Sequence, residues 1–369
     1  MSNLSKVKLQ DVATIQTGKL DSNAAVENGL YPFFTCDPKT LSIDTWAYDT
    51  EAVLLAGNNA SGNYTAKYYC GKFNAYQRTY IIESKFSDIL NTKFLSYAIN
   101  QQLCLLKSMS AGSTTKFLTM RMLNNLSLFL PSVAYQNRIA SILSAYDDLI
   151  ENNQKQIKLL EEAAQRLYKE WFVDLRFPGW ENTKIVDVVP EGWERLPLPQ
   201  IADIQYGFAF DGSLFNSSGY GTPIVRIRNI PDAETSDSTS EEASSEYLIN
   251  NGDIIVGMDG EFHINSWAGG QAYLVQRTCC IRPKIEKIRG WLLYSIHEPI
   301  KYFEKTIVGA TVAHLGKKHL DSITLLVPTE ELYAPFISIF NKRQILMEEN
   351  IKLREARDKL IYILMDKRV

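Results

Sequence analysis

The chain has 369 residues, with 39 Lys and Arg against 42 Asp and Glu, 45% hydrophobic residues and 11% aromatic residues. This length and hydrophobic content predict two or three globular domains, each with its own core, and exclude a mostly disordered or fibrous chain. No run of about 18 apolar residues occurs, and the N-terminal segment lacks the apolar core of a signal peptide. We therefore expect no membrane span and a cytoplasmic location. Five cysteines without CxxC spacing predict neither a disulfide framework nor a zinc site, so no metal is expected.

The sequence repeats itself along its length. LQDVATIQTG, at residues 9–18, returns as LPQIADIQYG at 198–207, and the segment 111–131 returns without a gap at 308–328. The tripeptide QRT also occurs in both halves, at 77–79 and at 276–278. Because these similarities keep the same order, they predict a tandem duplication and not a chance likeness between amphipathic stretches.

In chain order, each half begins with short strands and Gly-rich loops and continues into helices. Apolar or alternating runs predict strands over 52–56, 79–83, 224–228 and 253–257, and longer runs predict helices over 91–107 and 290–305. Each half is therefore expected to be a mixed α/β globule of ordinary domain size, the first over 1–134 and the second over 198–329.

A long helix is predicted after each globule, over 135–175 and 330–369, because apolar residues recur there at coiled-coil spacing. At 1.5 Å per residue each would be about 50 Å long, and two such amphipathic helices are expected to pair as an antiparallel coiled coil. The predicted seam residues are Ile142, Leu149, Asn153, Leu160, Leu167, Leu346, Asn350, Leu353 and Leu360. Arg343 and Arg357 interrupt the second stripe. Asn153 and Asn350 would form a buried polar pair that fixes the register, or else contact a partner.

One segment between the halves and one within the second half have a distinct composition. Residues 176–197 are rich in proline and tryptophan and are expected to form an ordered connector that ends the first long helix. Residues 231–246 are polar and acidic, which predicts a solvated loop, with a functional role as the alternative.

The motifs of a catalyst are missing from the sequence. Residues 309–318 have the wrong glycine spacing for a P-loop, and no methyltransferase cofactor turn or catalytic loop occurs. His314 and His319 are interpreted as surface residues in preference to metal ligands, and Cys279 and Cys280 as core residues. The chain is therefore not expected to be an enzyme on its own.

Charge is distributed unevenly between the halves. Residues 1–134 hold 12 basic and 9 acidic residues, whereas residues 198–328 hold 11 and 15, with six of these acids in the insertion. Basic, amide and hydroxyl side chains in the polar loops are of the type that contacts phosphates and base edges of DNA. Ordinary solvated charge is the alternative interpretation.

The plan of globule, helix, globule, helix resembles the DNA-specificity subunit of type I restriction–modification enzymes. The segment QRLYKEWFVDLRFPGW at 165–180, followed by VPEGWERLPL at 189–198, is similar to the central region of that family, and the resemblance covers nearly the whole chain. It implies an α+β protein with two target-recognition domains that read an interrupted, bipartite site in double-stranded DNA. It also implies partnership with two modification (methyltransferase) subunits and with restriction (translocase-nuclease) subunits. S-adenosylmethionine, ATP and Mg would bind those partners, and no cofactor is expected in this chain.

The resemblance places the Gly-Ser/Ala-Thr segments of both halves near DNA. From the residues themselves, loops 58–64 and 258–263 are candidates for base contacts, and the arginines of the two QRT tripeptides for phosphate contacts or for buried structural roles. Arg226 and Arg228 would alternate on a strand and face one surface. The predicted DNA-contacting residues are Asn58, Asn59, Lys67, Arg78, Gly112, Ser113, Thr114, Lys116, Arg226, Arg228, Asp259, His263, Arg277, Thr311, His314 and Lys317.

A protein-assembly scaffold is the alternative function, with two protein-binding globules and a coiled-coil spacer. It predicts no salt-dependent DNA affinity even with partners present.

Overall fold

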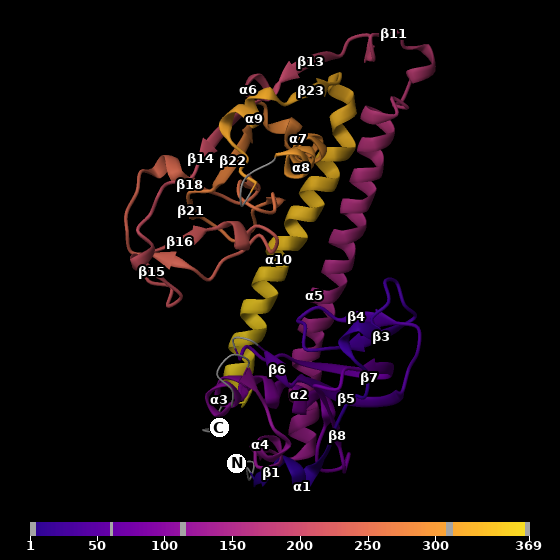
Figure 1. Ribbon diagram of the computed structural model, residues 1–369, viewed down its shortest axis with the longest axis vertical. Helices are drawn as coiled ribbons and strands as arrows, with labels where there is room; N and C mark the ends of the chain where they lie inside the picture. Colours follow the sequence, from indigo (N-terminus) through magenta and orange to yellow (C-terminus); the bar gives the residue numbers. More distant parts are fainter. Residues whose placement is uncertain (1–4, 60–61, 111–115, 308–312, 366–369) are drawn as a thin grey trace. The chain divides into compact units, whose positions relative to one another are not determined.

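The computed structural model describes residues 5–59, 62–110, 116–307 and 313–365. The chain divides into two compact units, residues 1–148 with 356–369, and residues 149–355. Each of the two long helices, α5 (Val133–Tyr168) and α10 (Ala334–Met365), contributes to both units (Figure 1).

The first unit contains a six-stranded sheet with the strand order β2-β8-β5-β7-β3-β4. Its strands are β1 (Ser5–Lys8), β2 (Ala13–Thr17), β3 (Tyr31–Phe34), β4 (Leu41–Ile43), β5 (Tyr48–Ala56), β6 (Asn58–Asn59), β7 (Ala66–Ala75), β8 (Thr79–Ser84), β9 (Lys116–Phe117) and β10 (Ser127–Leu130). Its helices besides the long ones are α1 (Leu9–Val12), α2 (Thr92–Gln101), α3 (Leu103–Met109) and α4 (Met120–Asn124).

The sheet of the first unit is buried on both faces at its centre. Val53 and Leu55 of β5 pack with Phe94 of α2 in one hydrophobic cluster, whereas Leu54 packs with Phe73 in a second cluster. Because successive side chains of a strand point to opposite faces, the apolar run at 52–56 supplies both clusters. The predicted strands over 52–56 and 79–83 are confirmed.

The second unit has the same kinds of elements, arranged as a four-stranded sheet (β14-β22-β19-β20) and a five-stranded sheet (β15-β17-β16-β21-β18). Its strands are β11 (Ile185–Val186), β12 (Val189–Pro190), β13 (Glu194–Pro197), β14 (Ala202–Tyr206), β15 (Phe215–Asn216), β16 (Thr222–Val225), β17 (Ser238–Thr239), β18 (Leu248–Ile249), β19 (Ile254–Gly257), β20 (Ile264–Ser266), β21 (Ala272–Leu274), β22 (Thr278–Pro283) and β23 (Thr324–Val327). Its shorter helices are α6 (Leu198–Ile201), α7 (Arg289–Ser295), α8 (His297–Thr306) and α9 (Lys317–Ser322).

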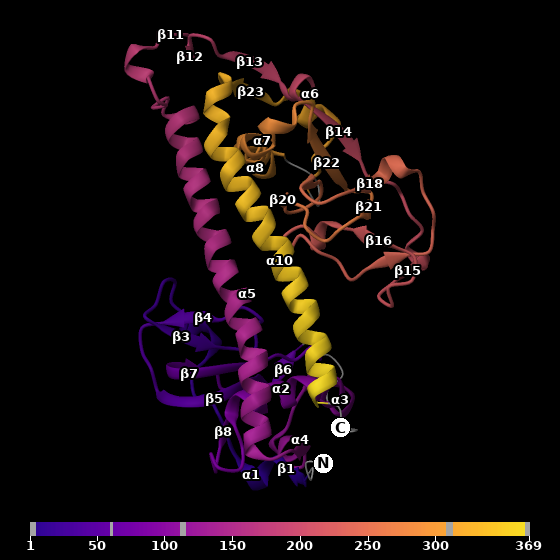
Figure 2. The same ribbon diagram turned by 180° about the vertical axis from the view of Figure 1, so that it is seen from behind.

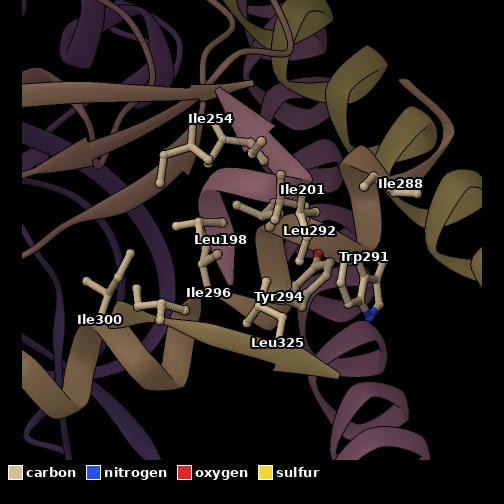
Figure 3. Close-up of a cluster of buried hydrophobic side chains, with 14 of the residues drawn as sticks. Leu198, Ile201, Ile254, Ile288, Trp291, Leu292, Tyr294, Ile296, Ile300 and Leu325 are labelled. Atoms are coloured by element: carbon tan, nitrogen blue, oxygen red, sulfur yellow. The ribbon is translucent and has the colours of Figure 1, made fainter. Parts of the chain in front are cut away.

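The largest core of the second unit lies between the four-stranded sheet and helices α6, α7 and α8. Figure 3 shows Leu198 and Ile201 of α6 beside Leu292 of α7, with Ile254 of β19 in the same cluster. Trp291 is fully buried there. The segment 176–197 also contributes to this core, because the ring of Trp193 lies 4.7 Å from that of Phe177. The expected connector is thus ordered by its aromatic residues.

Two of the predicted helices are each split into two. The helix expected over 290–305 is interrupted at Ile296, and the one expected over 91–107 at Gln102. The first interruption is caused by Pro299, which lacks an N–H and is tolerated in the first turn of a helix but not in its interior. A new helix therefore begins at His297.

The two long helices pair in antiparallel fashion within each unit. In the second unit the amide of Asn153 donates to Glu349 at 3.1 Å, and that of Asn350 donates to the Ile150 carbonyl at 3.4 Å. Residue numbers thus rise along α5 as they fall along α10, and the two segments run side by side in both views (Figures 1 and 2). The α+β class with an antiparallel helix pair is confirmed.

The buried stripe of α5 lies one residue beyond the predicted seam at two positions, Ile142 and Leu149. Asn153, Leu346 and Asn350 are buried, whereas Leu149 is 50% exposed and its neighbour Ile150 is buried instead. The other seam residues, Ile142, Leu160, Leu167, Leu353 and Leu360, are partly buried. Likewise Leu143 is fully buried beside the partly buried Ile142, so the buried positions Ile139, Leu143, Ile150 and Asn153 keep a regular 3–4 spacing along α5. The asparagines are buried as expected, but each bonds to the opposite helix through a different partner, so they do not form the predicted pair.

Arg343, which interrupts the apolar stripe of α10, is 5% exposed and bonds through three of its nitrogens. Its Nε donates to Glu161 of α5 at 2.7 Å, Nη1 to Ser266 Oγ at 2.7 Å and Nη2 to Asn265 Oδ1 at 2.6 Å. The arginine therefore ties both long helices to β20 of the second domain.

Arg357 has the corresponding role in the first unit. Its Nη1 donates to Asp147 of α5 at 2.7 Å, and the same carboxylate accepts a hydrogen bond from the hydroxyl of Tyr97 on α2. The pKa of Tyr97 is raised mainly by burial and, to a lesser extent, by this hydrogen bond. Each arginine that interrupts the stripe thus forms an ion pair with α5, and hydrogen bonds connect each pair to the adjacent domain.

The expectation that residues 231–246 form a solvated loop is wrong for the middle of the segment. Asp237, Ser238 and Thr239 are buried, and the last two form β17. Asp237 accepts hydrogen bonds from Arg226 at 2.6 Å and from Arg228 at 2.7 Å. The strand predicted over 224–228 likewise ends at Val225, and residues 227–229 turn so that both arginines reach this carboxylate.

Asp237 should make the second unit sensitive to acid. Burial favours the neutral carboxyl, but the hydrogen bonds and charges of Arg226 and Arg228 outweigh it and hold the pKa of Asp237 below its usual value. The stabilisation is therefore complete above the unfolded-state pKa of about 3.9 and is lost as pH falls through the lower folded-state pKa. We expect Asp237→Asn to remove this part of the pH dependence of urea unfolding between pH 5 and pH 3. Exposed Asp232→Asn is the matched control, and an equal change in both variants would contradict the assignment.

Candidate nucleic-acid interface

Three separate segments of the first domain meet at Gly57. The backbone N–H of Gly57 donates to the Arg78 carbonyl at 2.8 Å, and the Gly57 carbonyl accepts from the N–H of Leu118 at 2.8 Å. Immediately beyond Gly57, Asn58 and Asn59 of β6 pair with Phe117 and Lys116 of β9. These bonds bring the loop after β5, the QRT turn and the β9 segment together. We call this arrangement the three-segment frame.

The same frame occurs in the second domain around Met258. Its N–H donates to the Arg277 carbonyl at 2.8 Å, and its carbonyl accepts from the N–H of Leu315 at 2.8 Å. Asp259, the next residue, forms an isolated antiparallel bridge with His314. The same pattern of backbone hydrogen bonds therefore occurs within each domain, which confirms the duplication inferred from the sequence.

Polar side chains that were predicted as DNA contacts lie on both frames. In the first domain Asn58, Asn59 and Lys116 are half-buried, and Arg78 is exposed. In the second domain Arg277 is also exposed. The alternative of buried structural arginines in the QRT turns is therefore wrong: each arginine lies in a tight turn that points it to the surface.

The second frame carries a compact charged cluster of three predicted residues. Nη1 of Arg277 lies 3.2 Å from Asp259 Oδ2, and Nδ1 of His314 lies 2.5 Å from Asp259 Oδ1. The equivalent positions of the first frame hold a neutral amide, Asn58, and an aromatic ring, Phe117. The frames are thus alike in backbone and different in side-chain chemistry.

Other predicted contacts lie outside the charged cluster, although the His263 carbonyl accepts from the N–H of Gly257 beside the second frame at 2.8 Å. Nζ of Lys67 donates to Thr40 Oγ1 at 3.1 Å, and burial lowers the pKa of this ammonium group although Asp37 opposes the shift. His263 lies 3.7 Å from Glu261, and Lys317 forms a pair with Asp321 one helical turn along α9, at 3.0 Å. Gly112, Ser113, Thr114 and Thr311 lie outside the described residues.

One residue near the first frame, Lys107, was missed from the sequence. Lys107 of α3 donates to Asn63 Oδ1 at 2.7 Å, and the backbone N–H of Asn63 donates to Asn59 Oδ1 at 3.2 Å. This places a further basic side chain beside the polar loop. A contact between residues 44 positions apart has no local signal in the sequence.

The cysteines and the possible metal ligands can be placed in the described part of the chain. Across residues 5–59, 62–110, 116–307 and 313–365, no group of three or more His, Cys, Asp and Glu could hold a metal ion. Cys279 and Cys280 are buried in β22, as predicted, and burial raises the pKa of Cys279 to about 12. Such a thiol is a packing group and not a nucleophile at neutral pH. None of the helices in these same ranges is long and apolar enough to cross a membrane.

Comparison with known proteins connects this fold to one family. The family model of the type I restriction modification DNA specificity domain matches residues 1–162 and 190–354. The type I restriction enzyme EcoDI specificity subunit of Escherichia coli is 34% identical over 221 residues, which are 54% of this chain and 48% of that protein. The MjaIX specificity subunit of Methanocaldococcus jannaschii is 27% identical over 282 residues, 69% of this chain and 63% of that protein. The match therefore spans about half to just under two thirds of the length of these relatives.

A solved structure has the same fold. The crystal structure of the S subunit of a type I restriction–modification system from M. genitalium aligns with all of this chain and 97% of its own, with a TM-score of 0.64 and 17% sequence identity. At that identity the likeness establishes the fold alone. Because the family model matches each of the two duplicated halves, the chain belongs to the type I restriction modification DNA specificity domain family.

Proposed function

We propose that this chain is the non-catalytic DNA-recognition subunit of a type I restriction–modification enzyme in the cytoplasm. Each domain reads one half of an interrupted site in double-stranded DNA. Two modification subunits bind the chain and supply S-adenosylmethionine-dependent adenine methylation, and restriction subunits add the ATP- and Mg-dependent activities. The observation that carries the proposal is the three-segment frame, which is built twice with the same backbone bonds and carries different polar side chains each time.

Two frames with different side chains suit an asymmetric target. Base edges in the major groove are distinguished by hydrogen bonds that guanidinium groups donate, carboxylates accept and amides both donate and accept, and these are the groups on the frames. The helix α5 has 36 residues and is about 54 Å long at 1.5 Å per residue. This exceeds the 34–36 Å of one DNA turn, so the coil is long enough to separate two half-sites by a turn or more.

Co-expression with a modification subunit, followed by mapping of N6-methyladenine in the host DNA, tests the proposal. We expect a stable complex and a new interrupted motif that disappears when this chain is omitted. A stable complex without a motif would contradict DNA recognition and favour an assembly scaffold. No complex at all would contradict the proposed partnership.

A further inference from the structure

One nitrogen of the Arg277 guanidinium is held by a carboxylate, whereas most of the side chain is exposed. Nη1 lies 3.2 Å from Asp259 Oδ2, while the side chain as a whole remains 57% exposed. The residue has a positive φ of 72°, a conformation that a non-glycine residue adopts only where its surroundings impose it. The turn and the carboxylate together fix the direction in which the guanidinium points.

Asp259 is itself fixed from the other side. His314 Nδ1 lies 2.5 Å from Asp259 Oδ1, and the backbones of Asp259 and His314 form a bridge. Both carboxylate oxygens are thus occupied within the protein. The groups of the cluster that remain available to a ligand are the outer nitrogens of Arg277 and the second ring nitrogen of His314, whose side chain is 49% exposed.

The charge of this cluster favours a base over a phosphate. A carboxylate 3.2 Å from the guanidinium offsets its attraction for an anion, so a phosphate gains little from Arg277. Guanine instead offers two neutral acceptors, O6 and N7, which a fixed guanidinium can bind in bidentate fashion. The carboxylate then reduces the loss of side-chain freedom on binding.

The first domain supplies an internal comparison. Its equivalent arginine, Arg78, lies on the same frame, but the position of Asp259 is taken by the neutral Asn58. With no carboxylate at that position, Arg78 keeps its full attraction for phosphate. Equivalent arginines on the two frames are therefore suited to different contacts, Arg78 to a phosphate and Arg277 to a base.

We propose that Arg277, held by Asp259, reads a guanine in the half-site of the second domain. This inference rests on the proposed function and adds a specific base to it. Asp259 and His314 act as positioning residues, and Arg277 makes the contact with the base edge.

The test uses the full chain in complex with its modification subunits. The wild-type motif is mapped first, and duplexes with every single-base change are then compared by competition binding at several salt concentrations. Arg277→Lys is expected to lower the preference for guanine at one position of one half-site by about 10- to 100-fold, because lysine cannot form the bidentate contact. The other half-site should be unchanged. Asp259→Asn should weaken discrimination at the same position and raise the affinity for all sequences at low salt.

Arg78→Lys and Arg78→Ala are the matched comparison variants. Arg78→Ala should weaken binding to all sequences equally. The slope of the logarithm of the binding constant against the logarithm of the salt concentration should fall in magnitude by about one, as expected for a lost phosphate contact. If Arg277→Lys leaves the motif unchanged, or if Arg277→Ala behaves as Arg78→Ala is expected to, the inference is overturned. A change at a cytosine in Asp259→Asn alone would assign the reading to Asp259 instead and also overturn it. If the wild-type complex yields no motif, the proposed function fails first and the inference falls with it.

Discussion

Arg343→Met is expected to lower the free energy of unfolding of the unit formed by residues 149–355 by about 2–3 kcal/mol. Removing one member of a buried ion pair usually costs about 3–5 kcal/mol, and the 36% exposure of the Glu161 side chain reduces this because water can solvate the remaining carboxylate. Methionine keeps the volume of the site but leaves the buried Ser266 hydroxyl and the half-buried oxygen of Asn265 without their donor. The loss should appear as a lower urea midpoint of the full chain, followed by tryptophan fluorescence.

The fluorescence signal is well placed for this measurement. Five of the six tryptophans lie within residues 149–355, at positions 171, 180, 193, 267 and 291. Arg354→Met is the control on the same helix, because its pair with Glu234 is more exposed, and we expect a cost below about 1 kcal/mol. Arg343→Lys should recover only part of the loss, since an ammonium group cannot reach three partners in a plane. Equal effects of Arg343→Met and Arg354→Met would contradict the assigned role.

The behaviour of Arg343 shows what helical periodicity can and cannot predict. The 3–4 spacing of apolar residues predicts both long helices and most of their seam, because that spacing depends only on the local geometry of a helix. The partners of Arg343 are 182, 78 and 77 residues away along the chain. From sequence alone the arginine therefore looks like a defect in the stripe, although it is one of the most highly bonded residues of the helix.

In the candidate site, too, local features are predictable from the sequence and long-range contacts are not. The repeated QRT tripeptide correctly marks two equivalent turns, because repeated sequence implies repeated backbone. The cluster of Asp259, Arg277 and His314 depends on contacts across 18 and 55 residues, for which no periodicity exists. The strand predicted through Arg226 and Arg228 was wrong for a similar reason: Asp237, in a segment that looked solvated, draws both arginines into a turn.

The glycines that end the first repeated motif have a structural cause, and it leads to a second large expected effect. A Cβ atom at Gly207 would lie 2.1 Å from the carbonyl oxygen of Val275, and one at Gly18 would lie 2.2 Å from that of Ala75. In each domain this glycine also donates its N–H to the threonine of the QRT turn, at 3.0 Å. The close approach of two backbones therefore holds the QRT turn in place, and only glycine fits between them.

Gly207→Ala is expected to destabilise the second unit by about 3 kcal/mol or more, because a backbone carbonyl cannot move aside as a flexible side chain can. Gly212→Ala is the matched control five residues later: a Cβ there meets no atom within 4 Å, so the substitution should be neutral or slightly stabilising. Gly18→Ala should produce the same loss of stability in the first unit. Methylation mapping of the proposed complex would then show loss of recognition at one half-site for Gly18→Ala and at the other for Gly207→Ala. If Gly207→Ala unfolds in urea like the wild type, the two backbones are not in contact, and the frame that carries Arg277 is not fixed in the way described above.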